Sequence, residues 1–295
     1  MRIEMDNLSN MGVIKEILKR HGFNFSKALG QNFLINPTVC PKMAEASITH
    51  DNTGVIEIGP GIGVLTNELA KKAKNVVALE IDKRLIPVLN ETLAEHNNVE
   101  IINADVLKIN LNQLIEEKFK GMKVVVCANL PYYITSPIIM KLLEGKLNIE
   151  SITVMVQKEV AKRLCAGAAT RESGAVTVSV SYYSNPEYLF TVSPGSFIPA
   201  PKVDSAVVKL NVLKEPKYKV LDERTFFKIV KVAFSQRRKT IANSLGSGEG
   251  ISKKDLNEIF LKLNIDSSLR AEGLSMQQFA SIADEIYKLN GSISK

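Results

Sequence analysis

Short apolar runs alternate with longer amphipathic stretches through the first half of the chain. The runs cover Gly54–Ile58, Asn75–Ile81, Val99–Ile102, Lys123–Ala128 and Ser151–Gln157. Short apolar runs separated by segments of helix length are typical of parallel strands in an α/β domain. The pattern therefore predicts an open, mostly parallel sheet with helices between its strands.

The stretches between these runs have helical spacing. Leucines recur at four-residue intervals within Gly63–Lys72 and within Lys83–Glu95. Residues four apart lie on one face of a helix, so both segments are expected to bury one stripe. A further helix is expected to begin with Thr135 or Ser136 as its N-cap and Pro137 as its first residue.

Alternation of apolar and polar residues appears later in the chain. Val176, Val178 and Val180 alternate with small hydroxyl residues, and a similar alternation runs through residues 208–212. Because side chains of a strand point to opposite faces in turn, this pattern predicts late strands, including an antiparallel pair.

The composition changes around Lys214–Lys219, where charged residues and a proline suit a linker. Beyond it, helical spacing covers Arg224–Leu245, Lys253–Leu263 and Ser275–Leu289. We therefore expect two domains, a sheet-containing domain over residues 1–213 and a small helical domain over residues 214–295.

The 295-residue chain carries 38 Lys and Arg against 31 Asp and Glu, a net charge of +7. This balance favours an anionic partner such as nucleic acid or an acidic membrane surface. The three cysteines and three histidines have no metal-ligand spacing, so neither a metal site nor a disulfide framework is expected. Met1–Asn10 shows no signal-peptide pattern and no apolar run is long enough to span a bilayer, so a cytoplasmic protein is expected.

A glycine-rich turn follows the first apolar run. Glu57–Gly63 reads EIGPGIG and lies between a predicted strand and a predicted helix, where glycine lets a ligand approach the backbone. The spacing is Gly-x-Gly-x-Gly rather than the dinucleotide Gly-x-Gly-x-x-Gly, and Pro60 removes one N–H donor. The turn predicts a site for a nucleoside cofactor that includes Gly59 and Gly61.

Two carboxylates follow at the ends of the next two predicted strands. Glu80 is placed to accept hydrogen bonds from ribose hydroxyls, and Asp105 to receive the exocyclic amine of an adenine. Taken alone, either acid is equally well explained as a solvated loop carboxylate. Because ligands of open α/β sheets bind at successive strand ends, the ordered series is more persuasive. It resembles the class I methyltransferases that bind S-adenosylmethionine, with a Rossmann-like sheet.

The fourth run ends in Asn129-Leu130-Pro131-Tyr132, which is similar to the motif of enzymes that methylate adenine at N6. The N6 lone pair is delocalised into the ring, so it attacks a sulfonium methyl poorly unless two acceptors pyramidalise the amine. The resemblance implies that the Asn129 side-chain oxygen and the Leu130 carbonyl are those acceptors, with Pro131 fixing the turn. It also implies that Tyr132 and Phe197 stack on the flipped base.

The match extends to the ribosomal RNA small-subunit adenine dimethyltransferase family and covers nearly the whole chain. It rests also on Lys27–Leu34, Gln157–Ala161 and Ser235–Thr240. By this resemblance Asn32 and Leu34 close over the cofactor, while Gly59, Glu80, Asp105 and Asn129 line it.

The resemblance also implies the reaction. Such enzymes convert two adjacent adenosines near the 3′ end of small-subunit ribosomal RNA to N6,N6-dimethyladenosine, with S-adenosylmethionine as the methyl donor. The expected partner is the immature small ribosomal subunit during ribosome biogenesis, and the enzyme is expected to be a monomer.

Arg237, Arg238 and Lys239 are consecutive on a predicted helix, so they spread around its circumference and cannot all face one partner. One or two of them are expected to bind RNA phosphates, and the others to contact the catalytic domain or water. A purely solvated basic face is the alternative.

Three other functions compete with this interpretation of the sequence. A relative that methylates large-subunit RNA and confers antibiotic resistance shares the glycine turn, but the long C-terminal segment favours the small-subunit branch. A non-enzymatic RNA-binding or assembly factor is disfavoured by the intact Asn129, Tyr132 and Phe197. A nicotinamide dehydrogenase is disfavoured by the glycine spacing and by the lack of an evident catalytic tyrosine and lysine pair.

Overall fold

The computed structural model describes residues 10–23, 31–248 and 251–293. The chain divides into two compact units: unit 1 comprises Met1–Ala161 and Glu187–Val212, and unit 2 comprises Lys162–Pro186 and Leu213–Lys295. The expected boundary after residue 213 lies within one residue of the observed one. The expected division differs in one respect, because residues 162–186 group with the C-terminal unit rather than with the sheet.

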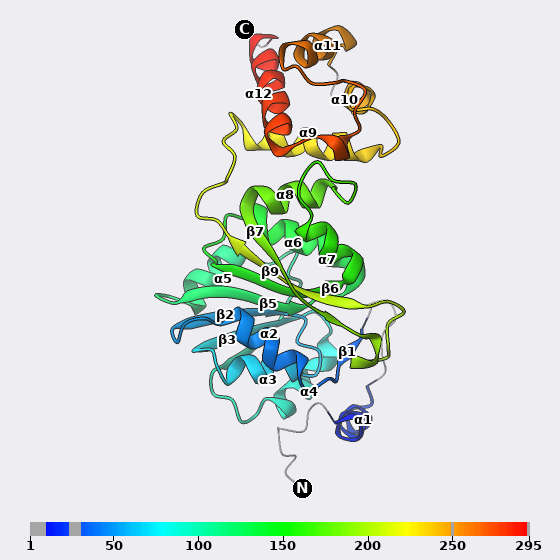
Figure 1. Ribbon diagram of the computed structural model, residues 1–295. Helices are drawn as coiled ribbons and strands as arrows, with labels where there is room; N and C mark the ends of the chain where they lie inside the picture. Colours follow the sequence, from blue (N-terminus) through cyan, green and yellow to red (C-terminus); the bar gives the residue numbers. More distant parts are fainter. Residues whose placement is uncertain (1–9, 24–30, 249–250, 294–295) are drawn as a thin grey trace. The chain divides into compact units, whose positions relative to one another are not determined.

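The elements alternate regularly over most of unit 1 (Figure 1). The strands are β1 Phe33–Leu34, β2 Thr53–Ile58, β3 Asn75–Glu80, β4 Val99–Asn103, β5 Lys123–Asn129, β6 Ser151–Gln157, β7 Ser184–Val192, β8 Phe197–Ile198 and β9 Ser205–Val212. The α-helices are α1 Met11–Arg20, α2 Val39–Ser47, α3 Val64–Ala70, α4 Ile86–Thr92, α5 Leu111–Lys118, α6 Thr135–Glu144, α7 Lys158–Cys165, α8 Ala175–Tyr183, α9 Glu223–Ser235, α10 Ile241–Gly248, α11 Lys253–Lys262 and α12 Met276–Ile293. Short 3₁₀ turns are η3 Lys83–Leu85, η4 Tyr132–Ile134, η5 Pro194–Ser196 and η6 Ala271–Gly273.

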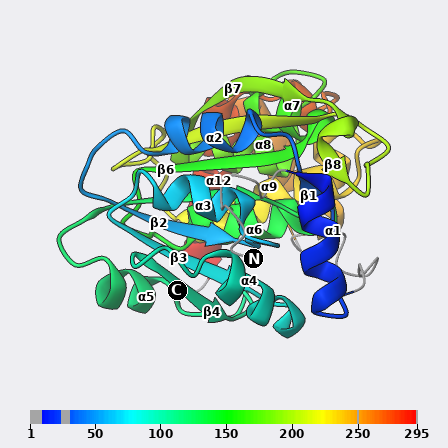
Figure 2. The same ribbon diagram turned by 90° about the horizontal axis from the view of Figure 1, so that it is seen from below.

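The main sheet has seven strands in the order β4-β3-β2-β5-β6-β9-β7 (Figures 1 and 2). β2 pairs in parallel with β3 on one side and with β5 on the other, and β6 pairs in parallel with β5. β9 then runs antiparallel to β6. The strand order therefore reverses direction between β2 and β5, which is the place where open α/β sheets bind their ligands.

The predicted parallel strands are confirmed. The five apolar runs correspond to β2 through β6, each within one residue at either end, and the late alternating segment at residues 208–212 lies in the antiparallel strand β9. All six residues of β2 are buried, because helices cover both faces of a central parallel strand.

The strand expected around Val176–Val180 is wrong, since these residues form helix α8. The backbone N–H of Gly174 donates to the Thr177 hydroxyl at 3.1 Å, a contact that starts the helix. Val178 and Tyr182, one helical turn apart, are buried with residues of α9 in the core of unit 2. Tertiary packing on several faces of α8 therefore outweighs the two-residue alternation and explains why this segment groups with unit 2.

Two further local predictions are wrong. Helix α6 has Ile134 as its N-cap, so Thr135 is already inside the helix and Pro137 is its third residue. The Thr135 hydroxyl donates back to the Pro131 carbonyl at 3.2 Å instead of capping a helical N–H. The single helix expected over Arg224–Leu245 is two helices, α9 and α10, separated by a turn.

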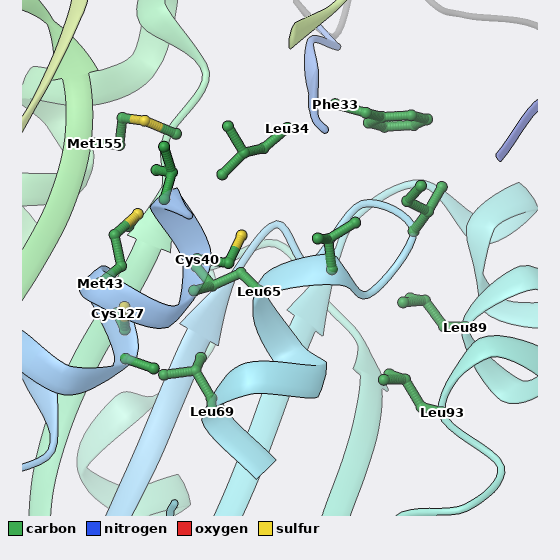
Figure 3. Packing of buried hydrophobic residues seen from close by; sticks show 14 of the residues in the cluster. Phe33, Leu34, Cys40, Met43, Leu65, Leu69, Leu89, Leu93, Cys127 and Met155 are labelled. Carbon is green, nitrogen blue, oxygen red and sulfur yellow. The ribbon is translucent and has the colours of Figure 1, made fainter. Parts of the chain in front are cut away.

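The main hydrophobic core of unit 1 extends from the sheet to the N-terminal segment. Cys40 and Met43 of α2 lie beside Leu65 and Leu69 of α3 above the strands (Figure 3). Phe33, Leu34 and Phe197, which belong to the short β1 and β8 strands, are part of the same buried cluster. The small β1–β8 sheet is therefore anchored to the main sheet by apolar packing.

Within the described ranges, no helix combines the length and the apolar character needed to cross a membrane.

We predict that Gly54→Ala destabilises unit 1. A Cβ at Gly54 of β2 would lie 2.2 Å from Cδ1 of the Phe119 ring, and Phe119 is itself only 2% exposed. Overpacking of this kind costs about 1–3 kcal/mol. The matched control is Gly167→Ala, where an added Cβ meets no atom within 4 Å. Calorimetric melting of both variants tests this, and equal melting temperatures would contradict the predicted clash.

Candidate active site

A pocket opens at the carboxyl ends of the central strands, at the reversal of strand order between β2 and β5. Its walls come from the N-terminal segment, the turns after β2, β3 and β5, and the start of β8. The lining residues are Gln31, Asn32, Phe33, Leu34, Glu57, Gly59, Pro60, Gly61, Ile62, Val64, Leu65, Glu80, Ile81, Leu85, Asn129, Leu130, Pro131, Tyr132, Tyr133 and Phe197. All of the sequence-predicted cofactor and catalytic residues except Asp105 are brought together here.

The glycine turn forms the floor of this pocket. Gly59 and Gly61 have φ values of +70° and +62°, a backbone conformation that side chains disfavour. A Cβ at Gly61 would lie 3.3 Å from the Phe33 ring. The sequence motif therefore has a structural reason: the backbone turns sharply after β2 and passes directly beneath the N-terminal segment.

Glu80 ends β3 and is almost fully buried beside this turn. The backbone N–H of Asp82 donates to its Oε1 at 2.8 Å. Burial raises the pKa of Glu80, while hydrogen bonds from the backbone of Asp82 and Gly61 oppose the rise. A carboxylate held in this way at a strand end is suited to accept hydrogen bonds from two hydroxyl groups.

Asp82, two residues after Glu80, connects the strand end to the N-terminal segment. It accepts hydrogen bonds from Gln31 Nε2 at 2.9 Å and from the Arg84 guanidinium at 2.7 Å. These donors lower the pKa of Asp82, with the Arg84 side chain as the largest cause. The Arg84 guanidinium also lies 5.1 Å from the centre of the Phe23 ring. Phe23 and Gln31, the described residues on either side of residues 24–30, therefore both contact the segment that follows β3.

Glu57, on β2, is a pocket residue that the sequence analysis did not single out. It is fully buried, and neither carboxylate oxygen completes a hydrogen bond within the described residues. Burial raises the pKa of Glu57 to about 8, and the neighbouring Thr66 hydroxyl opposes only part of that rise. A buried carboxyl without a partner beside a glycine turn suits a ligand that carries positive charge. The sequence signal was an acid inside an otherwise apolar strand.

Asp105 does not line the pocket. Its Oδ1 accepts a hydrogen bond from the Leu107 N–H at 2.9 Å, and its Oδ2 lies 3.6 Å from Lys108 Nζ. The neighbouring Ala104 N–H donates to the Glu80 carbonyl at 3.0 Å, so Asp105 follows the strand end beside Glu80. Its contact with an adenine amine remains a prediction.

Asn129 and Leu130 present two unused acceptors at the end of β5. The Asn129 side-chain nitrogen donates to the Asn32 carbonyl at 3.4 Å, and the Leu130 N–H donates to the Met155 carbonyl at 3.1 Å. In the described part of the chain, no group donates to the Asn129 side-chain oxygen or to the Leu130 carbonyl oxygen. Both residues line the pocket, so a planar amine placed there can donate to two oxygens.

Two aromatic side chains line the same pocket as these acceptors. The Tyr132 hydroxyl is hydrogen-bonded to the Ser205 hydroxyl at 2.6 Å, and burial raises the pKa of Tyr132. Phe197 is 3% exposed and pairs with Leu34 across the β1–β8 sheet. Phe197 is therefore both a core residue and a pocket wall, which are the two roles that the sequence left open.

The loop between β8 and β9 is held at the end that leads into β9. Lys158 donates to Asp204 twice, from its backbone N–H to the carbonyl and from Nζ to Oδ2, both at 3.0 Å. Strands β6 and β9 pair Gln157 with Ser205, the residues next to Lys158 and Asp204. The Gln157–Ala161 and 197–205 motifs thus meet at one point, next to Tyr132. The resemblance included Gln157–Ala161, but the contact between Lys158 and Asp204 was not predicted.

The N-terminal motif is described only in part. Asn32 contacts Asn129, and Leu34 lies opposite Phe197, so the two predicted cofactor residues do reach the pocket. Lys27–Gly30 of the motif and Met1–Ser9 of the segment searched for a signal peptide lie outside the described residues.

The basic residues of unit 2 lie in a different setting from the predicted one. Arg237, Arg238 and Lys239 lie in the turn between α9 and α10 rather than on a helix, and all three are exposed. The predicted fan around a helix is therefore wrong. The Arg237 guanidinium lies 4.0 Å from the Glu272 carboxylate of the same unit. In the described ranges, neither Arg238 nor Lys239 has an acidic partner.

Comparison with known proteins gives this geometry a context. The profile of the family "Ribosomal RNA adenine dimethylase" matches residues 22–288. Ribosomal RNA small subunit methyltransferase A of Alkaliphilus oremlandii is 48% identical over 285 residues, which are 96% of this chain and 99% of that protein.

Two solved structures share the fold. A dimethyladenosine transferase from Plasmodium falciparum aligns with a TM-score of 0.68 and 26% identity, over 88% of this chain and 98% of that one. The 23S rRNA methyltransferase ErmE aligns with a TM-score of 0.64 and 26% identity, over 87% of this chain and all of that one. The sheet is thus the Rossmann-like sheet of class I methyltransferases. On the profile match and the near-complete overlap with its relatives, the chain belongs to the ribosomal RNA adenine dimethylase family.

Proposed function

We propose that this enzyme dimethylates N6 of two adjacent adenosines near the 3′ end of small-subunit ribosomal RNA, in the immature small subunit. The observation that carries the proposal is the pair of unused acceptors on Asn129 and Leu130, which line one pocket together with Tyr132 and Phe197. The identity of 48% to a small-subunit enzyme, against 26% to a large-subunit one, supports the choice of RNA.

The strand ends are suited to hold S-adenosylmethionine, which supplies an electrophilic methyl group on a positively charged sulfur. Glu80 is placed to bind ribose hydroxyls, and the glycine turn lets the ligand approach the backbone of Gly59 and Gly61. The unpartnered carboxylate of Glu57 favours the positive charge. Asn32 and Leu34 close the site from the N-terminal side, and Asp105 is proposed to reach the adenine amine from the neighbouring strand end.

The acceptors supply the chemistry on the RNA side. When N6 donates both of its hydrogens to Asn129 Oδ1 and to the Leu130 carbonyl, its lone pair is turned out of the ring plane. The nitrogen then forms the new N–C bond as the S–C bond breaks, and the released proton passes to water. Pro131 fixes the turn that presents the Leu130 carbonyl. Tyr132 and Phe197 hold the flipped base between them.

Unit 2 is proposed to bind RNA. Arg238 and Lys239 are exposed and without acidic partners in the described part of the chain, so they are free to contact phosphates. Arg237 is the weaker candidate because Glu272 lies near it. The enzyme is further proposed to act as a monomer in the cytoplasm, where small subunits mature.

The direct test is incubation with labelled S-adenosylmethionine and small-subunit particles that lack the modification, followed by mass spectrometry of RNA fragments. Dimethyladenosine at two neighbouring positions near the 3′ end is expected. Label on large-subunit RNA in a parallel reaction would instead select the large-subunit function, and no transfer to either RNA would refute the proposal.

We predict that Asn129→Ala abolishes detectable methyl transfer while RNA binding is retained. The substitution removes one of the two acceptors that turn the N6 lone pair out of the ring. Asn112→Ala is the matched control, because Asn112 lies on α5, where its side chain donates to the Gly145 carbonyl. Turnover and RNA affinity are measured for both variants, and turnover by Asn129→Ala at the wild-type rate would rule out this role.

We predict that Glu80→Ala weakens S-adenosylmethionine binding by about 10- to 100-fold, because a charged acceptor contributes roughly 1.5–3 kcal/mol per hydrogen bond. Glu100→Ala is the control, since Glu100 lies on the outer strand β4 and forms an ion pair with Lys118 of α5. Isothermal titration calorimetry measures both affinities. An unchanged affinity for Glu80→Ala would exclude the ribose contact.

We predict that Glu57→Gln stabilises the ligand-free protein at pH 8 and above relative to wild type, but much less at pH 5. The folded-state pKa of Glu57, about 8, lies above its usual value of 4.5. Folding therefore favours the protonated form, and stability is lost as pH rises from 4.5 through 8. The amide cannot ionise, so it escapes this loss.

The same substitution is expected to weaken S-adenosylmethionine binding, because the amide cannot ionise, whereas a cationic ligand favours the ionised form of the Glu57 carboxyl. Melting temperatures of both proteins at a series of pH values, with and without the ligand, test both effects. A difference in melting temperature that does not change with pH would show that Glu57 is not the titrating group.

A further inference from the structure

One aromatic side chain of the pocket has no partner within the described part of the protein. Tyr133 follows Tyr132 in the 3₁₀ turn η4, lines the pocket and is 60% exposed. Within the described ranges, no hydrogen bond or ring contact involves Tyr133. Because it both lines the pocket and faces solvent, it lies at the pocket mouth.

The two adjacent tyrosines are used differently. The Tyr132 hydroxyl is held by the buried Ser205 at 2.6 Å, which fixes the ring on the inner side of the turn. Successive residues of a 3₁₀ turn project about 120° apart, so Tyr133 points away from that contact. The hydrogen bond to Ser205 therefore holds Tyr132 inside the pocket, while Tyr133 lies at the pocket edge.

Other exposed apolar side chains of unit 1 do not share this setting. Tyr188 is 37% exposed, but its hydroxyl is bonded to Thr191 at 2.7 Å and it does not line the pocket. Ile81 lines the pocket and is 54% exposed, but it follows Glu80 on the cofactor side and is not aromatic. Of the large exposed side chains that are described, Tyr133 alone is an aromatic at the edge of the acceptor site.

We propose that Tyr133 is a second base-binding site, which stacks on the nucleotide next to the adenosine held in the pocket. The inference rests on the proposed function. Because the two target adenosines are covalent neighbours, one of them lies just outside the pocket while the other is inside. A base separated from its neighbour in this way loses a stacking partner, and an exposed aromatic ring replaces it.

The position of Tyr133 gives this site a direction. A single ring lies on one side of the pocket mouth, so it contacts the neighbour on one side of the flipped base only. Each target adenosine has a neighbour on that side, so loss of the ring slows the transfer to both, but the contacted neighbour is itself a target adenosine in only one of the two cases. A contact with the RNA backbone alone would not depend on whether that neighbour carries a base.

The test compares Tyr133→Ala, Tyr133→Phe and the control Tyr188→Ala on unmodified small-subunit particles. A second set of particles carries an abasic nucleotide in place of either target adenosine. Single-turnover methyl transfer at each remaining adenosine is measured by mass spectrometry, and S-adenosylmethionine affinity is measured by calorimetry.

Tyr133→Ala is expected to lower kcat/KM by about 5- to 150-fold at each adenosine, the range that loss of one base–aromatic stack produces. Tyr133→Phe and Tyr188→Ala should stay near wild type, and S-adenosylmethionine affinity should not change. With the abasic neighbour on the contacted side, wild type should fall to the rate of Tyr133→Ala, and the variant should lose nothing more.

Equal rates for wild type and Tyr133→Ala would overturn the proposal. The proposal would also be overturned if the loss of kcat/KM from Tyr133→Ala and the loss from the abasic neighbour multiplied when both were present. Tyr133 would then act on something other than the neighbouring base. A changed S-adenosylmethionine affinity would place Tyr133 in the cofactor wall. Wild-type enzyme that modifies neither adenosine would refute the proposed function itself, which is a separate outcome from unequal variants.

Discussion

The parallel pairing of β2 with β5 is the constraint on which the rest of the structure depends. β2 continues to β3 on one side of this pair, and β5 continues to β6 on the other, so the chain leaves the two strands in opposite directions. That divergence opens the space that the glycine turn and the Asn129 turn share. Because both faces of β2 are buried, its register with β5 is fixed by apolar packing, and the two turns are held at a constant separation.

The sequence predicted the parts of this arrangement that are encoded locally. The runs that form β2 through β6 are apolar for their whole length, since they are covered on both faces, and no other element explains such runs separated by helices. The strand-end motifs were equally readable, because Gly59 and Asn129 serve a turn that their own neighbours define. All but one of the predicted cofactor and catalytic residues line one pocket.

The parts that were missed depend on partners far along the chain. Val176–Val180 alternates like a strand, yet it is helical because Thr177, Val178, Ser179 and Val180 are all buried, with Val178 in the core of unit 2. The turn at residues 236–240 interrupts a continuous helical pattern, and the Ile241 N–H bonds to the Leu269 carbonyl at 2.6 Å. Neither the packing of Val178 in unit 2 nor the Ile241–Leu269 hydrogen bond is signalled by the sequence around these residues. The Tyr132–Ser205 bond spans 73 residues, and Gln31–Asp82 spans 51.

The pocket combines groups that folding alone would not favour. Glu57 is buried without a hydrogen-bond partner among the described residues. The Asn129 side-chain oxygen and the Leu130 carbonyl oxygen accept no hydrogen bond from the described chain. Tyr133 exposes its aromatic ring to solvent. Each lowers the stability of the free protein, and each matches one component of the proposed reaction: a cationic donor, a planar amine and an unstacked base. A ligand that satisfies these groups binds the folded state alone, so binding and stability are coupled at this site. The strong apolar core of β2, α2 and α3 beneath the pocket is what allows the fold to keep them.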